Sequence, residues 1–427
     1  MIGEGMLKKI IPIGILIAII IIGAVALFMY KPWGGVGVPT QPTDTRNTAV
    51  TATATTTTSS GMIVLTFTYE DLSVKAEIPR KEVLITGGGS TFVNPQMQAW
   101  AQKFRSVSGG YVTVNYQSIG SGAGEAKWFD KALDFGASDV PISKTTYDRL
   151  ISRKASFIQI PLIAGAVGII YNIPEWDESK CGPLRLSGDV IADIYLGKIL
   201  YWDDDRIKMQ QVEECRSLLP HEIIRGIHRS DGSGTTALFT LYLSTVSSEW
   251  KTRVGTGYTV EWPRDAMGYG EGARGNEGVS AKVKGTKYSI GYVEYSYAVA
   301  NKIPMAALKN KDGFYIVPSA EAVMEALKRG AKDLPPPSSF WGDVPATLIN
   351  REGEKTYPIV GMVYAFIYTD IVSDIVSNKD LAAALSAFFK WVLTEGQKPE
   401  NIVTGYVPLP KELAAKAIKY IEDYLKY

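Results

Sequence analysis

The sequence has little of what metal and redox chemistry require. Among its 427 residues it holds only two cysteines, Cys181 and Cys215, and two histidines, His221 and His228. No CxxC or HExxH spacing occurs, which argues against a structural zinc site or a zinc protease. We therefore expect neither a metal nor a cofactor. The two cysteines are either buried free thiols or, outside the cytoplasm, a single disulfide.

The sequence also lacks an excess of charge of either sign. The 45 basic residues almost balance the 44 acidic ones, and the net charge is +1. A chain without a basic excess has no electrostatic footprint for nucleic acid, so we expect no nucleic-acid partner. With 46% apolar residues, the chain can bury sizeable cores. Its length predicts about two or three domains.

One long hydrophobic run stands at the N-terminus. Lys8 and Lys9 precede residues 10–29, a stretch without any charge. Such a helix spans roughly 30 Å, the hydrocarbon thickness of a bilayer, and the basic residues before it place the N-terminus in the cytoplasm. We predict a cytoplasmic stub and transmembrane anchor over residues 1–30, with cleavage after Ala26 as the alternative. The Thr-rich residues 31–62 resemble a stalk. The rest of the protein would then lie outside the cell membrane.

From residue 63 onward, short β-rich runs alternate with amphipathic helical stretches, which predicts an α/β fold. One pattern recurs: a strand, a turn rich in Gly and Ser or Thr, and then a helix. Ligands of α/β sheets lie at the carboxyl ends of strands, and helix N-termini hold anions with their free N–H groups. No GxxxxGK[ST] sequence is present, which disfavours nucleotides. The repeated pattern therefore indicates a site for a small oxyanion.

Four of these segments resemble the phosphate-binding proteins of Pst-type ABC transporters. They are TGGGSTF at 86–92, YQSIGSG at 116–122, DFGASD at 134–139 and HRSDGSGTT at 228–236. Further family-like runs follow at 194–199, 254–257 and 291–295. The resemblance covers residues 83–427. The sequence departs from the family pattern where Val93 and Asn94 precede Pro95 and over residues 309–356, and neither departure touches the inferred anion contacts.

The resemblance implies a two-lobed periplasmic-binding-protein fold of type II with two crossover segments. Lobe I would hold residues 83–162 plus 299–427, and lobe II residues 163–298, with the ligand enclosed between them by hinge closure. The function implied is capture of inorganic phosphate and its delivery to the permease subunits and ATPase of an ABC transporter. We expect a monomer that is not an enzyme.

By the same resemblance, Arg229 supplies the one full positive charge of the site, in the planar fork that suits phosphate oxygens. Asp231 would orient that fork, although it is also a candidate N-cap near Ser233. The remaining phosphate donors are hydroxyls and backbone N–H groups. The hydroxyls are those of Thr91, Ser121, Ser233 and Thr235, and the N–H groups are those of Phe92 and Gly234.

Asp139 is the specificity residue that the resemblance implies. A carboxylate beside an anion is repulsive unless it accepts a hydrogen bond from that anion. Phosphate near neutral pH keeps a proton to donate and sulfate does not, so Asp139 would select phosphate. The alternative is that Asp139 caps the segment after Val140 and Pro141. We expect the Gly-rich residues 268–278 to form a mobile loop that leads into a helix, with Arg274 as a weaker candidate contact.

Three other functions compete with phosphate transport. Ser233 lies near His228 and Asp231, which suggests a hydrolase triad, but the GxSxG elbow is missing and the three residues lie too close along the chain. A carrier for sulfate or molybdate would gain nothing from Asp139. A surface phosphate sensor without transport is compatible with the stalk.

Overall fold

The computed structural model describes residues 61–331, 333–370 and 379–427. The predicted anchor at residues 1–30 and almost all of the predicted stalk at 31–62 lie outside these ranges. Within the described ranges, no helix is both long enough and apolar enough to cross a membrane.

An eight-stranded mixed sheet organises the molecule, in the order β4-β3-β5-β13-β6-β10-β8-β9. On one side, β3 runs parallel to β4 and β5, and on the other, β8 runs parallel to β10 and β9. We call these the β3 side and the β8 side. The predicted α/β fold is confirmed. The strands are β3 (Val83–Gly89), β4 (Val112–Ser118), β5 (Phe135–Ser138), β6 (Phe157–Asn172), β8 (Arg225–Arg229), β9 (Gly270–Ala273), β10 (Ser289–Glu294) and β13 (Val360–Tyr368).

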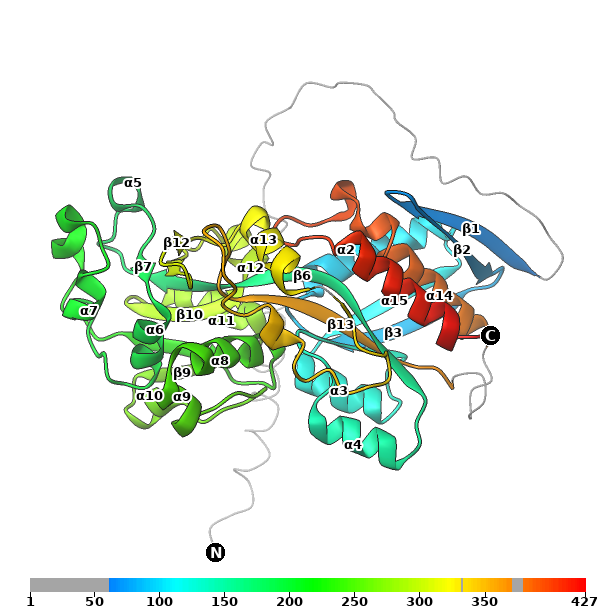
Figure 1. Cartoon of the computed structure of the whole chain (residues 1–427), viewed down its shortest axis with the longest axis horizontal. Helices are drawn as coiled ribbons and strands as arrows, with labels where there is room; N and C mark the ends of the chain where they lie inside the picture. The colour runs from blue at the N-terminus through cyan, green and yellow to red at the C-terminus, as the bar shows by residue number, and fades with distance from the viewer. Residues whose placement is uncertain (1–60, 332, 371–378) are drawn as a thin grey trace, which may run out of the picture. The chain divides into compact units, whose positions relative to one another are not determined.

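The long strand β6 joins the two sides of the sheet. Its first part, Phe157 to Ala166, pairs with β13, and its last part, Val167 to Asn172, pairs with β10. All but its last residue is buried, which fits its continuous run of apolar residues. Figure 1 shows β6 and β13 running between the two groups of strands. The predicted first boundary between the lobes, at 162/163, falls inside β6, and the lobe boundaries remain a prediction.

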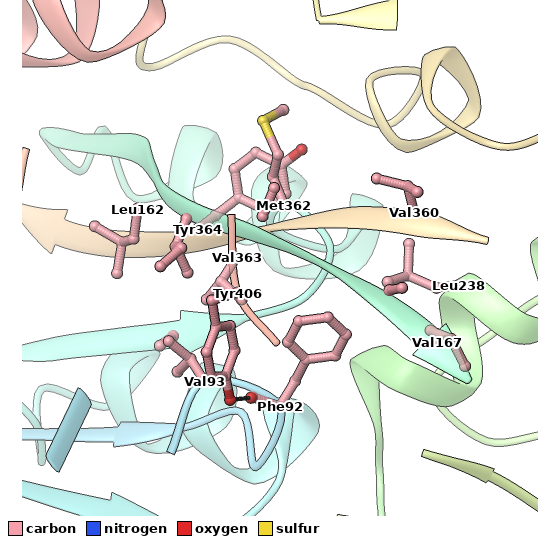
Figure 2. Packing of buried hydrophobic residues seen from close by; sticks show 14 of the residues in the cluster. Phe92, Val93, Leu162, Val167, Leu238, Val360, Met362, Val363, Tyr364 and Tyr406 are labelled. Atoms are coloured by element: carbon pink, nitrogen blue, oxygen red, sulfur yellow. Dashed lines mark hydrogen bonds between the residues drawn. The ribbon is translucent and has the colours of Figure 1, made fainter. Parts of the chain in front are cut away.

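Hydrophobic side chains from distant segments pack around the paired strands β6 and β13. Figure 2 shows Leu162 and Val167 of β6 with Met362 and Val363 of β13, close to Phe92 from the turn after β3. All five side chains are at most 1% exposed. Phe92, one of the predicted phosphate contacts, is therefore held by the same core that connects the two sides of the sheet.

Helix α2 (Asn94–Val107) shows how the helices of the β3 side form. Pro95 occupies its first turn, where a missing N–H costs nothing. It buries Met97, Trp100, Ala101 and Phe104, apolar residues that recur at helical spacing. The hairpin of β1 (Met62–Tyr69) and β2 (Leu72–Pro79) packs on helix α14. The other helices of this side are α3 (Ser121–Phe129), α4 (Lys144–Ser152), α14 (Lys379–Val392) and α15 (Lys411–Tyr424).

On the β8 side, Cys181 and Cys215 form a disulfide, which decides between the two alternatives. A small sheet pairs β11 (Ala307–Lys309) with β7 (Arg185–Leu186) and β12 (Tyr315–Ile316). The remaining helices are α5 (Glu178–Cys181), α6 (Gly188–Tyr195), α7 (Asp205–Lys208), α8 (Gly234–Val246), α9 (Ser248–Arg253), α10 (Pro263–Ala266), α11 (Gly275–Gly285), α12 (Tyr295–Asn301) and α13 (Ala320–Gly330). Short 3-10 turns are Glu213–Leu218, Pro345–Thr347, Glu395–Gln397 and Pro399–Asn401.

Candidate functional site

The structure brings together the four predicted turns, which follow the carboxyl ends of β3, β4, β5 and β8. Gly122 from the turn after β4 donates its N–H to the carbonyl oxygen of Gly232 at 3.0 Å, across the two sides of the sheet. A Cβ atom at Gly234 would lie 2.7 Å from Ser121 Oγ and 2.8 Å from Asp139 Cβ, so only glycine permits this approach. The eight main predicted contact residues are buried, whereas the weaker candidate Arg274 is exposed. The eight are Thr91, Phe92, Ser121, Asp139, Arg229, Ser233, Gly234 and Thr235.

Arg229 is the buried cation of this cluster, with a side chain that is 1% exposed. Its Nε donates to Asp231 Oδ1 at 2.8 Å and its NH2 group donates to Asp231 Oδ2 at 2.5 Å. Burial opposes the charged guanidinium, but the pairing with Asp231 outweighs it and the pKa of Arg229 lies above its ordinary value. The backbone N–H of Gly275 also donates to Asp231. Asp231 thus holds the fork at two points, and it is Ser233 that caps helix α8.

Asp139 is a buried carboxylate in the same cluster. Ser90 donates its hydroxyl to Oδ1, and Thr235 donates its hydroxyl to Oδ2 at 2.7 Å. Burial raises the pKa of Asp139 to about 6, and the Ser90 and Thr235 hydroxyls and the Arg229 charge oppose this rise. The alternative role as a helix cap is wrong, because Ser143 caps the following helix α4. A carboxylate that protein donors hold in place is thus available to accept from a ligand.

The N-terminus of helix α8 points its first backbone N–H groups into the cluster. Ser233 is the N-cap, and its Oγ accepts from the N–H of Thr236 at 3.1 Å. Gly234 and Thr235 open the helix, so their N–H groups have no partner within it. The positive end of the helix dipole and these N–H groups favour an anion beside the Arg229 guanidinium.

The turn after β3 is held by two tyrosines. Tyr406 donates its hydroxyl to the carbonyl oxygen of Phe92, as the dashed line in Figure 2 marks, and its ring packs edge-on against the Phe92 ring. Tyr297 donates to the carbonyl oxygen of Thr91 at 2.6 Å. With both carbonyls engaged in the core, the backbone at Thr91 and Phe92 has a single orientation.

Several residues of the cluster were not indicated by the sequence motifs. Ser90 and Asn276 bond directly to predicted site residues, and the Tyr292 hydroxyl accepts from the backbone N–H of Arg229. The Gly-rich residues 268–278 are strand β9 and the start of helix α11, so the expectation of a mobile loop was wrong in its first part. Asn276 bonds to the site, and Arg274 is the N-cap position of α11. The sequence feature that could have indicated Asn276 is a polar residue directly after a glycine at the start of a helix.

The geometry excludes the hydrolase triad. His228 Nε2 lies 2.9 Å from Asp265 Oδ1, and its Nδ1 lies 3.0 Å from the carbonyl oxygen of Arg229. Both ring nitrogens are therefore occupied away from Ser233. Within residues 61–331, 333–370 and 379–427, no group of three or more His, Cys, Asp or Glu side chains could hold a metal ion.

Comparison with known proteins places this fold in one class. A model of the PBP superfamily domain matches residues 39–395, which defines a binding protein of the periplasmic-binding-protein type. Among solved structures, a human phosphate-binding apolipoprotein superimposes with a TM-score of 0.58 at 18% identity, covering 78% of this chain and 93% of that one. At this identity the superposition supports the fold alone.

Sequence relatives define the family more narrowly. The phosphate-binding protein PstS of Methanocaldococcus jannaschii is 40% identical over 332 residues, which are 78% of this chain and 84% of that protein. PstS of Pasteurella multocida is 39% identical, over 78% of this chain and 88% of its own. The chain belongs to the PstS family of phosphate-binding proteins. The predicted resemblance is confirmed, and the family is one of binding proteins, not enzymes.

Proposed function

We propose that this protein binds inorganic phosphate between the β3 side and the β8 side and delivers it to an ABC transporter. The observation that carries the proposal is that a buried cation, Arg229, and a buried acceptor, Asp139, lie in one cluster of hydroxyl and N–H donors. A cation and helix N-terminus select an anion. An acceptor in the same place selects an anion that still carries a proton, as phosphate does near neutral pH.

Each site residue has a role in this proposal. Arg229 binds one phosphate oxygen with the part of its fork that Asp231 leaves free. Asp139 accepts the phosphate proton. The donors to the other oxygens are the hydroxyls of Thr91, Ser121 and Ser233 and the backbone N–H groups of Phe92 and Gly234. Thr235, whose hydroxyl proton goes to Asp139, donates its backbone N–H. Of these groups, Asp139 is the one that cannot donate when it is ionised. It therefore favours an anion that has a proton to give, and we assign the choice between phosphate and sulfate to it.

We further propose that residues 10–29 anchor the protein in the cell membrane, with the binding domain on the extracytoplasmic side and attached through the Thr-rich segment. The charge-free run and the two lysines before it support this arrangement. A monomer tethered in this way would deliver phosphate to the permease subunits, which work with their ATPase.

Isothermal titration of the purified protein, stripped of any co-purified ligand, tests the proposal. Phosphate should bind with measurable heat, and sulfate and molybdate should not. Arg229→Ala should abolish the phosphate heat, because the buried cation is lost. Absence of heat with phosphate in the parent protein would overturn the proposal, and stronger binding of sulfate or molybdate would replace it with a carrier of that anion.

A further inference from the structure

Asn276, at the start of helix α11, bonds to both sides of the sheet at once. Its side chain is fully buried. Its Nδ2 donates to Thr91 Oγ1 at 2.9 Å and to Thr235 Oγ1 at 3.3 Å, and its backbone N–H also donates to Thr91 Oγ1, at 3.2 Å. Thr91 follows β3 and Thr235 lies in helix α8 after β8, so one amide group connects two hydroxyls of the proposed site.

The orientation of this amide is determined by its other end. Asn276 Oδ1 accepts from the backbone N–H of Glu294 at 3.0 Å. A backbone N–H can only donate, so the atom that faces it is the amide oxygen. The NH₂ group of Asn276 therefore faces the two threonines, and both of its contacts there are donations.

These donations determine where the threonine protons point. A hydroxyl has one proton and two lone pairs. Thr91 Oγ1 accepts from two donors of Asn276, which occupies its lone pairs and leaves its proton directed elsewhere. Thr235 Oγ1 accepts from Asn276 and gives its own proton to Asp139. The direction of donation thus runs from Glu294 through Asn276 and Thr235 to Asp139.

We propose that Asn276 is a positioning residue for phosphate: it makes Thr91 a hydrogen-bond donor to the anion and joins the turn after β3 to the β8 side around it. This inference rests on the proposed function. Asn276 carries no charge and does not touch the phosphate. It acts through Thr91, and its bond to Thr91 forms only when the two sides meet.

Other contacts across the two sides do not depend on Asn276. Tyr258 donates its hydroxyl to Glu125 at 2.8 Å, and Gly122 donates to Gly232. The two sides can therefore still meet when the Asn276 side chain is removed. Without that side chain, the direction of the Thr91 proton is no longer fixed. The hydrogen bond from Asn276 Nδ2 to Thr91, which must break when phosphate leaves, is also lost. The rate of phosphate release should therefore rise more than the rate of binding falls.

A double-mutant cycle tests the coupling. Phosphate affinity and release rate are measured for the parent, Asn276→Ala, Thr91→Val and the double variant. Each single change should weaken phosphate binding about 10-fold or more, since each removes the same directed donor. The double variant should bind about as well as the weaker single variant, because the second change removes an interaction already lost.

Asn310→Ala is the matched control. Asn310 is also buried, and its Nδ2 donates to the carbonyl oxygens of Gly353, Glu354 and Thr356, none of which belongs to the site. This variant should lose thermal stability but keep the phosphate affinity of the parent. Unaltered phosphate affinity in Asn276→Ala, or independent and additive effects of the two site substitutions, would overturn the proposal.

Asn276→Asp covers the case in which Asn276→Ala fails to fold. It keeps the shape of the side chain and the backbone donation to Thr91, but it replaces the NH₂ donor with an acceptor and adds negative charge. Phosphate binding should weaken more than 10-fold; parent-like affinity would again contradict the proposal. If the parent itself gives no heat with phosphate, both the proposed function and this inference are wrong. If the parent binds phosphate but the effects of the Asn276 and Thr91 substitutions are additive, only this inference is wrong.

Discussion

Arg229 and Asp231 form a two-point ion pair inside the site, with N–O distances of 2.8 and 2.5 Å. Burial favours the neutral form of Asp231, yet the guanidinium and the N–H of Gly275 hold the pKa of this carboxyl below its ordinary value. The pair thus keeps a desolvated cation in place before an anion arrives. An anionic ligand would add negative charge beside the Arg229 guanidinium, in addition to the charge of Asp231.

Asp231→Asn should destabilise the free protein, by about 3–5 kcal/mol, because it leaves the buried Arg229 without a counter-charge. Phosphate supplies part of the missing charge, so it should raise the melting temperature more in the variant than in the parent. Thermal melts with and without phosphate measure both effects. Asp333→Asn removes the charge that pairs with Lys416 at the surface but keeps an oxygen for the N–H of Leu334. It serves as the control, with little change expected. An equal phosphate effect in the two proteins would contradict the charge argument.

Asp139→Asn should relax discrimination between phosphate and sulfate, because an amide can donate to a fully deprotonated anion. In the parent, the pKa of Asp139 is about 6. Its carboxylate is the acceptor above that pH, so selectivity should be high at pH 7 and fall at pH 5. The variant should lack this pH dependence. Competition titrations with sulfate at the two pH values measure it.

Asp134→Asn is the control for this substitution. Asp134 lies just before β5 and accepts from the backbone N–H of Thr86, so its replacement should not affect selectivity. A variant of Asp139 that rejects sulfate as strongly as the parent does would show that this carboxylate is not the selective group.

Glu294 should make stability fall as pH rises. It is fully buried, and one carboxylate oxygen accepts from the N–H and hydroxyl of Ser296, whereas Oε1 has no hydrogen-bond partner among the described residues. Burial raises the pKa of Glu294 to about 8. The unfolded chain loses this proton at about pH 4.5 and the folded protein keeps it to about pH 8, so the folded state binds more protons in that window. Stability therefore falls with rising pH there.

Glu294→Gln removes this pH dependence of stability, since the amide stays neutral. The free energy of unfolding of the variant relative to the parent should increase by about 1.4 kcal/mol for each pH unit across the window. Urea unfolding at pH 5, 7 and 9 measures the difference, in which other titrating groups cancel. A difference that does not depend on pH would mean that Glu294 is ionised in the folded protein throughout.

The disulfide between Cys181 and Cys215 should stabilise the β8 side. The two residues are 34 apart in sequence, and closing a loop of this length in the unfolded chain is worth about 3–4 kcal/mol in the chain-entropy estimate. A reducing agent should lower the melting temperature of the parent. The double variant with Cys181→Ser and Cys215→Ser should melt at that lower temperature with or without the reductant. Parent melting that does not respond to complete reduction would contradict this prediction.

Much of the site is local in sequence, and such features were predictable. The glycines and hydroxyl residues that follow β3, β4 and β8 determine turns within a few residues, and Arg229 meets Asp231 only two positions away. The buried face of α2 follows from helical periodicity. Carboxyl ends of parallel strands meet at one edge of a sheet, so the turns that carry Thr91, Ser121 and Asp139 had to be neighbours.

The amino-acid sequence alone therefore determined the turns, the charge that they hold and the type of anion that they suit. Only the tertiary structure decided that β6 pairs first with β13 and then with β10. It also decided that Asn276 bonds to Thr91, which is 185 residues away in the sequence. Such contacts depend on which segments pair across the sheet. Pairing is decided by the free energy of the whole core, to which residues from the entire chain contribute, and no local pattern contains it.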